Sequence, residues 1–251
     1  MSESKLFEDH HTHTVFSHGK GTIVENVAAA AAAGIRTIGI ADHGPGHVGF
    51  GMKLEDVPQM RAEIALAQEQ HPEMQVLLNV EANIINYSGH LDVSSEDQKL
   101  FDRIIAGYHR GVFGEEPVRA FFTHIGSCWY GLTSGSTAHR RVLNTELVIR
   151  ALEQNRIFML SHPGSKAAFD LRCIAEACAA CGTLLEINSH HDGLSAEGIR
   201  IAAECGAGLL ISSDAHRPEQ VGRSGRAIGR AEEAGIPSSL ILNLKEEARW
   251  N

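Results

Sequence analysis

The sequence lacks a long apolar run, an excess of basic residues and an even set of cysteines. Its longest small-apolar stretch, Val27–Ala33, is far shorter than the roughly 18 residues of a membrane span, so we expect no membrane segment. A formal net charge of −9 argues against a broad basic face, which makes nucleic acid an unlikely partner. Five cysteines, an odd number, fit reduced thiols, and the acidic start lacks a secretory profile. Both features predict a cytoplasmic protein.

Several familiar catalytic motifs are also missing. The sequence has neither a Gly-x-Ser-x-Gly nucleophile elbow nor a His-Glu-x-x-His helix, so serine acyl transfer and proteolysis of the zincin type lack support. Gly44–Gly49 matches the spacing of a dinucleotide-binding loop, but it contains a proline and no helix follows it directly. We interpret these glycines as letting a loop pass close to a ligand site.

Seven short β-type runs alternate with helical runs along the 251 residues, a pattern typical of βα units and a parallel sheet. Nothing marks a linker, so we predict an α/β fold in one domain, residues 1–251. The expected strands are Leu6–His10, Arg36–Ala41, Gln75–Glu81, Arg103–Tyr108, Ile157–Ser161, Thr183–Asn188 and Gly208–Ser213. The expected helices are Thr22–Ala33, Leu54–Gln70, Thr137–Gln154, Lys166–Cys181, Ser195–Cys205 and Ser224–Ala234.

Histidine is unusually abundant, with 15 residues against 9 Phe and 3 Tyr. If the runs are strands of a barrel, the residues at their C-terminal ends face one mouth. Each of the seven ends carries residue types that bind metals: Asp9, His11 and His13; Asp42 and His43; Glu81; His109; His162; Asn188, His190 and His191; Asp214 and His216.

The spacing of these residues favours shared ions. His11-x-His13 places two imidazoles on one side of an extended segment, and Asp214-x-His216 repeats that geometry. Glu81 and Asp214 supply carboxylates that could bridge ions, and so imidazole-rich a set suits zinc, iron or manganese. One such histidine alone would more often be a hydrogen-bonded surface residue, but all seven ends together predict a polynuclear metal site.

Four separated motifs agree in sequence and order with a known family. The motifs are Asp9-x-His11-x-His13 with His18 after it, Asp42-His43-Gly44, Ser161-His162-Pro163-Gly164 and Ser213-Asp214-Ala215-His216, with Glu81 and His109 between them. Together they resemble the PHP (polymerase and histidinol phosphatase) superfamily, in particular its stand-alone metal-dependent phosphatases. The resemblance runs from residue 9 to residue 216.

The resemblance implies a distorted (β/α)7 TIM-like barrel with a trinuclear metal centre, usually of Zn²⁺, with Mn²⁺ or Fe as alternatives. It implies a first ion held by His11, His13, Glu81 and Asp214. A second ion would share Glu81 with His109 and His162, and a third would take His18, His43 and His216. Asp9, by the same resemblance, would orient an imidazole rather than bind metal.

Three divalent ions outweigh two carboxylates, so the natural guest is an anion such as a small phosphomonoester attacked by a metal-activated water. Arg217 and Arg110, next to His216 and His109, could pair with phosphate oxygens. His43 or His216 could protonate the leaving group if it holds no metal. His190 and His191 could touch substrate, replace a ligand or cap the sixth strand.

Other functions stay open at this point. One is a nuclease of the same family acting on nucleic-acid ends, and another is a metal-binding accessory protein without turnover. A third is an amidohydrolase-like C–N hydrolase, which lacks the expected bridging lysine. The stretch Phe113–Ser136 is long for a connection, and it could be a lid or a surface excursion.

Overall fold

A computed structural model describes residues 6–109, 111–112 and 136–244 of the chain. Its centre is one sheet of seven parallel strands in the order β1 to β7, so the predicted α/β barrel is confirmed. Thr12 of the first strand forms a parallel bridge with Ala215, which lies three residues past the end of the last strand, and the barrel is therefore nearly closed. The strands are β1 Glu8–Thr12, β2 Thr37–His43, β3 Gln75–Asn83, β4 Arg103–Gly107, β5 Met159–Leu160, β6 Leu184–Asn188 and β7 Leu209–Ser212.

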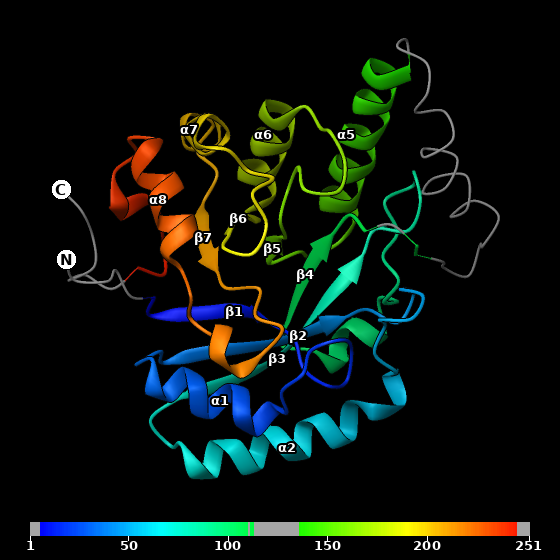
Figure 1. Ribbon diagram of the computed structural model, residues 1–251. Helices are drawn as coiled ribbons and strands as arrows, with labels where there is room; N and C mark the ends of the chain where they lie inside the picture. The colour runs from blue at the N-terminus through cyan, green and yellow to red at the C-terminus, as the bar shows by residue number, and fades with distance from the viewer. Residues whose placement is uncertain (1–5, 110, 113–135, 245–251) are drawn as a thin grey trace.

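Helices surround this sheet. Figure 1 shows α1 and α2 on one side of the strands and α5 to α8 on the other. The α-helices are α1 Ile23–Ala32, α2 Val57–Gln70, α5 Ser136–Gln154, α6 Leu171–Cys181, α7 Ala196–Glu204 and α8 Gly225–Glu233. Short 3₁₀ turns are η1 Leu54–Asp56, η2 Asp97–Leu100, η4 Pro218–Gln220 and η5 Ser238–Leu240. Within the described ranges, every helix is too short or too polar to cross a membrane.

Local sequence signals determine where the helices begin. The hydroxyl of Thr22 accepts from the amide of Glu25, whose carboxylate accepts from the amide of Thr22, which completes the predicted capping box of α1. Helix α6 begins later than predicted, at Leu171, because the Asp170 side chain caps it by accepting from the amide of Cys173. The residues before Asp170 are therefore free to form the loop that follows His162.

Strand β1 lies two residues later than predicted, and it is irregular. Its pairing with β2 changes register between Asp9 and Thr12, as in a β-bulge. The neighbours His10 and His11 are both fully buried as a result: His10 contacts Glu8, and His11 contacts Glu186 across the barrel. Strict alternation would have turned one of these two rings away from the other.

Apolar packing occupies two places. A large core lies between the sheet and the helices, and a small cluster of Ala41, Ile105, Met159 and Leu210 lies apart from it. Ile105 is in register with Glu81, so this small cluster fills the barrel interior beneath the polar residues at its mouth. The arrangement gives the polar side chains a rigid floor.

Candidate metal centre

The predicted ligands converge at the C-terminal mouth of the barrel. His11 lies in β1, and His13 is the first residue after it. His43 is the last residue of β2, and Glu81 lies two residues before the end of β3. Most of these residues are buried, and only His18 and His216 are partly exposed. The buried members are His11, His13, His43, Glu81, His109, His162 and Asp214.

One tight group joins β1 to the loop after β7. His13 Nε2 lies 3.2 Å from both His11 Nε2 and Asp214 Oδ1, and His11 Nε2 lies 3.4 Å from Glu81 Oε2. Two ligand atoms each about 2.0–2.1 Å from a tetrahedral zinc ion are about 3.3 Å apart. These four side chains therefore have a spacing compatible with one coordination shell.

A second group forms around the other oxygen of Glu81. His162 Nε2 lies 2.9 Å from Glu81 Oε1 and 3.0 Å from His109 Nε2, while His109 Nε2 is 3.3 Å from the same oxygen. Glu81 thus directs one carboxylate oxygen to each group. This is the arrangement expected of a carboxylate that bridges two cations.

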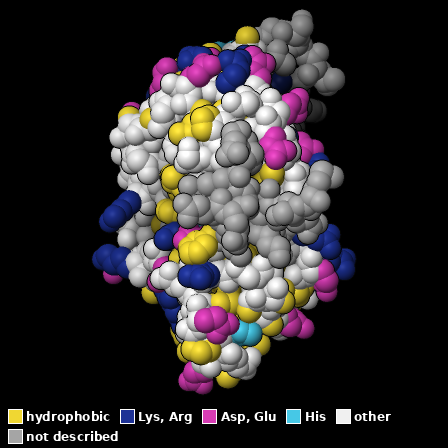
Figure 2. All heavy atoms as spheres, turned by 90° about the vertical axis from the view of Figure 1, so that its left-hand side faces the viewer, with side chains coloured by type: hydrophobic (Ala, Val, Ile, Leu, Met, Phe, Trp, Pro, Cys, Tyr) yellow, Lys and Arg dark blue, Asp and Glu magenta, His cyan; other side chains and the backbone are white. Residues whose placement is uncertain are grey.

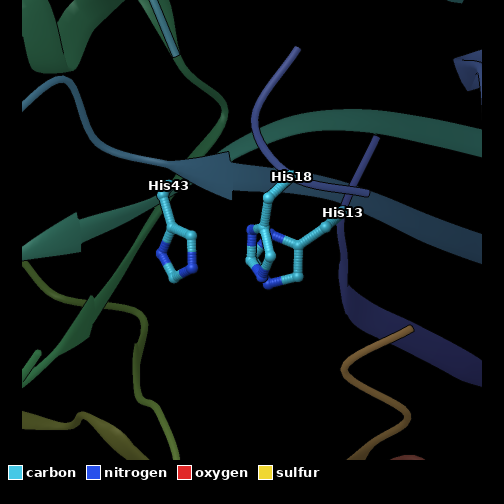
Figure 3. A group of neighbouring side chains, drawn as sticks. All are labelled: His13, His18 and His43. Carbon is cyan, nitrogen blue, oxygen red and sulfur yellow. The ribbon is translucent and has the colours of Figure 1, made fainter. Parts of the chain in front are cut away.

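The third group consists of imidazoles from the loop after β1 and from β2. Figure 3 shows the rings of His13, His18 and His43 turned toward one another, and one ligand nitrogen of each lies within 4.8 Å of the others. His216 borders this group, with its ring centroid 4.2 Å from that of His18. The structure therefore places His13 between the first and third groups, whereas the resemblance assigned it to the first alone.

Unsatisfied polar atoms concentrate in this cluster. Five buried ligand atoms have no hydrogen-bond partner among the described residues: Nδ1 of His13, His18 and His43, Oε2 of Glu81 and Oδ1 of Asp214. A buried polar atom left unsatisfied costs about 1–3 kcal/mol. Cations would satisfy all five at once, so the donor set fits bound metal.

The backbone is strained at two of these residues. His162 and Asp214 have φ of 28° and 53°, the positive values found among the described non-glycine residues. Such conformations cost about 1–3 kcal/mol each and persist where surrounding contacts impose them. The amide of His162 donates to Glu186 Oε2 over 2.6 Å, which anchors the strained segment.

Glu186 was missed in the sequence analysis although it organises the centre. Its Oε1 accepts from His11 Nδ1 at 2.8 Å, and its Oε2 accepts from the side chain of Asn188 at 2.9 Å. Asn188 also donates to Asp214 Oδ2 at 3.0 Å. The sequence signal for Glu186 is a single acidic residue inside a mostly apolar strand. A search of the strand ends does not find it, because Glu186 lies within the strand.

Asp9 has a different task from the expected one. Its carboxylate accepts from the backbone amides of Ser213 at 3.1 Å and Gly222 at 3.0 Å. Asp9 is in register with Ile38, a member of the outer core, so it lies before the register shift and faces away from the ligand rings. The expectation that it orients an imidazole is wrong: it holds the loop after β7.

The cavity over the centre measures about 450 Å³. Among the predicted substrate contacts, His191 lines it, while His190 stacks on His216 and lines a neighbouring cavity. Arg217 is exposed and does not line the cavity. Arg110 and residues 113–135 lie outside the described residues. Four lining residues went unpredicted: His47, Ser165, Lys166, which is the cationic side chain of the described wall, and Phe50, whose side chain is exposed.

Charges on the outer surface are mixed. On the face turned to the viewer in Figure 2, the coloured Lys and Arg side chains are interspersed with Asp and Glu. This face offers no continuous basic field among its coloured atoms, which agrees with the acidic composition. A nucleic-acid track on it is therefore not supported.

Burial sets the protonation states that metal binding needs. It lowers the pKa of His109 to about 3 and the pKa of His18 to about 4. Burial opposes ionisation of Glu81, yet the charges of His109, His11 and His43 hold its pKa well below the usual value. Most rings are thus neutral and the carboxylate ionised near neutral pH, which are the forms that ligate metal.

These shifts predict how the metal-free protein responds to acid. Lowered histidine pKa values mean that the unfolded chain binds more protons below about pH 6.5, so stability is lost as pH falls. His11 and His162 have raised pKa values and act in the opposite sense, but fewer groups do so. We expect the Tm of chelator-treated protein to fall between pH 7 and pH 5, and His18→Gln to make the decline shallower. If thermal melts gave the same Tm at pH 7 and pH 5, the expected loss of stability in acid would be contradicted.

This chain is similar in sequence and in fold to known proteins. The model of the PHP domain family matches residues 9–190. A probable phosphatase of Shewanella sp. strain MR-4 is 30% identical over 97% of this chain and 89% of its own length. One from Acetivibrio thermocellus is 28% identical over 97% of this chain and 93% of its own. The fold is similar to that of a histidinol phosphate phosphatase from Lactococcus lactis, solved with zinc, L-histidinol and phosphate (TM-score 0.61, 18% identity, 93% of each chain).

Proposed function

The chain belongs to the PHP domain family, and from that premise we propose that it is a metal-dependent phosphatase acting on a small phosphomonoester at a centre of three divalent ions. One observation carries the proposal: imidazoles and carboxylates from the strand ends meet in one cavity, where five buried ligand atoms make no hydrogen bond within the described residues. The probable phosphatases that align over nearly the whole chain support it.

The residues divide into three ligand sets. His11, His13, Glu81 and Asp214 would hold the first ion, Glu81 with His109 and His162 the second, and His18, His43 and His216 the third. We propose zinc as the resident ion, with manganese or iron as alternatives, because imidazole donors dominate the set. When bound, such ions polarise phosphoryl oxygens and lower the pKa of a water towards ~7.

The chain's own groups would position and neutralise the ester. Lys166 and His191 line the cavity and would face a bound phosphate dianion, and a volume of about 450 Å³ admits a small molecule. His216 Nδ1 is engaged with the carbonyl of Asp214 at 2.8 Å, which leaves its Nε2 for a ligand or a proton. A proton for the leaving group would come from His43 or His216 where either is free of metal. We retain Arg217, Arg110 and His190 as candidate outer contacts of the substrate.

The test is phosphate release from a panel of phosphomonoesters and a short oligonucleotide. One preparation is assayed with added zinc, with added manganese and with a chelator. We expect metal-dependent release from small monoesters that the chelator suppresses and added metal restores. Release from the oligonucleotide alone would replace the proposal with a nuclease. Bound metal without any release would favour an accessory protein or a C–N hydrolase.

A further inference from the structure

Asp92 is an acidic residue that belongs to none of the ligand sets, yet it reaches the edge of the centre. Residues 84–91 leave the end of β3 and fold back, with Ile84 bridging Leu91 in antiparallel pairing. The turn is locally encoded, because Asn86 Oδ1 accepts from the amide of Ser88 and Gly89 adopts a φ of 81°. This return places Asp92 beside Asn83, the last residue of β3.

The Asp92 carboxylate ties two segments together. Its Oδ1 accepts from the backbone amide of Asn83 at 2.7 Å, and its Oδ2 accepts from the amide of Gly46 at 2.8 Å and from the side-chain amide of Asn83. A Cβ at Gly44 would lie 2.4 Å from the Asp92 carboxylate, so the loop after β2 can approach only with glycine there. Asp92 therefore fixes both that loop and the amide plane of Asn83.

The orientation of the Asn83 amide follows from simple donor and acceptor rules. An ionised carboxylate only accepts, so Asn83 must present its NH₂ to Asp92 and its oxygen to the opposite side. That oxygen lies 2.7 Å from His109 Nδ1. His109 must then carry its proton on Nδ1, which leaves a lone pair on Nε2 facing Glu81 and His162.

We propose that Asp92 is a positioning residue that acts through Asn83 to select the His109 tautomer able to bind metal through Nε2. The inference rests on the proposed function only in taking His109 as a ligand, because the tautomer exists whether or not the protein is a phosphatase. Asp92→Asn removes the main constraint, since an amide at position 92 can donate or accept and lets Asn83 turn over. The constraint that remains is the long contact of 3.4 Å from the Asn83 side-chain nitrogen to the Gly44 carbonyl oxygen. A turned Asn83 would direct its NH₂ at Nδ1 and move the proton to Nε2.

A polarity swap distinguishes this relay from general structural support. In Asp92→Asn combined with Asn83→Asp, the carboxylate at position 83 accepts from both neighbours, so the Nδ1–H tautomer returns. A purely structural role predicts that the double variant is worse than either single one. Asp102→Asn is the matched control, because Asp102 also accepts a backbone amide, that of Leu78 at 2.7 Å, at a site outside the metal cavity.

The experiment is ¹⁵N NMR of histidine-labelled protein at pH 8, with and without zinc, and zinc titration of each variant. His109 should be the Nδ1–H tautomer in the wild type, in Asp102→Asn and in the double variant, and should change in Asp92→Asn. Zinc affinity should fall about 10–100-fold in Asp92→Asn and recover in the swap. An Nε2–H tautomer in the wild type, or unchanged tautomer and affinity in Asp92→Asn, would overturn the proposal. Absent phosphatase activity with the expected tautomers would instead contradict only the proposed function.

Discussion

Replacing Glu81 with glutamine is expected to abolish activity while leaving the fold intact. Glu81 lies within 3.6 Å of five histidines of the centre. Its Oε2 is 2.9 Å from His43 and 3.4 Å from His11, and its Oε1 is 2.9 Å from His162. Glutamine has the same shape, but it is neutral and turns one acceptor into a donor. Charge stabilisation worth several kcal/mol is lost, so kcat/KM should fall by on the order of 10³ or more.

Metal content should fall together with activity in Glu81→Gln, because one carboxylate serves two of the ligand groups. Glu176→Gln is the matched control, since Glu176 is exposed on α6 and outside the cavity. Circular dichroism confirms folding, and elemental analysis gives metal per chain. A Glu81→Gln protein that keeps both metal and activity would refute the bridging role.

Gly107→Ala is expected to damage the centre from beneath. A Cβ at Gly107 would lie 2.5 Å from Cε1 of His109, 2.6 Å from Oγ of Ser161 and 3.1 Å from Oε1 of Glu81. The interior of the barrel is closely packed, so the methyl group must displace His109 or Glu81. A displacement near 1 Å can cost about 10²-fold in rate, which is the loss we expect in kcat/KM.

The control for Gly107→Ala is Gly229→Ala on α8, where an added Cβ meets nothing within 4 Å. Alanine inside an exposed helix is favoured over glycine by roughly 0.5–1 kcal/mol, so this variant should be fully active and slightly more stable. Steady-state kinetics measure kcat/KM of both variants, and thermal melts measure their stability. Equal activity of the two alanine variants would show that the second ligand group tolerates displacement, contrary to the structure.

Much of the centre was predictable because the rule behind it is geometric. Parallel barrel strands end at one mouth, so reading the end of each strand found Glu81, His109, His162 and Asp214 without any knowledge of tertiary contacts. Boundary errors of two residues did not matter, because the ligands lie at or just past those ends. The parallel sheet followed from the alternation of β-type and helical runs, and the barrel from the resemblance to the PHP superfamily.

What failed to be predicted depended on side-chain direction. Because of the register shift in β1, the Asp9 side chain points away from His11, whereas the His10 side chain points into the barrel. No feature of residues 8–13 predicts that shift. Glu186 lies inside β6, where an apolar pattern hides which face points into the barrel. Asp92 reaches Asn83 only because residues 84–91 fold back, a contact set by the path of a loop.

We expect phosphoester hydrolysis by this protein to depend on metal bound by this cluster. The most direct measurement follows zinc per chain and phosphate release in the same samples, as chelator-treated protein is titrated with zinc. We expect no phosphate release without metal, and activity that rises with zinc occupancy until about three ions are bound per chain. Full activity in the metal-free protein, or bound zinc that leaves phosphomonoesters intact, would contradict it.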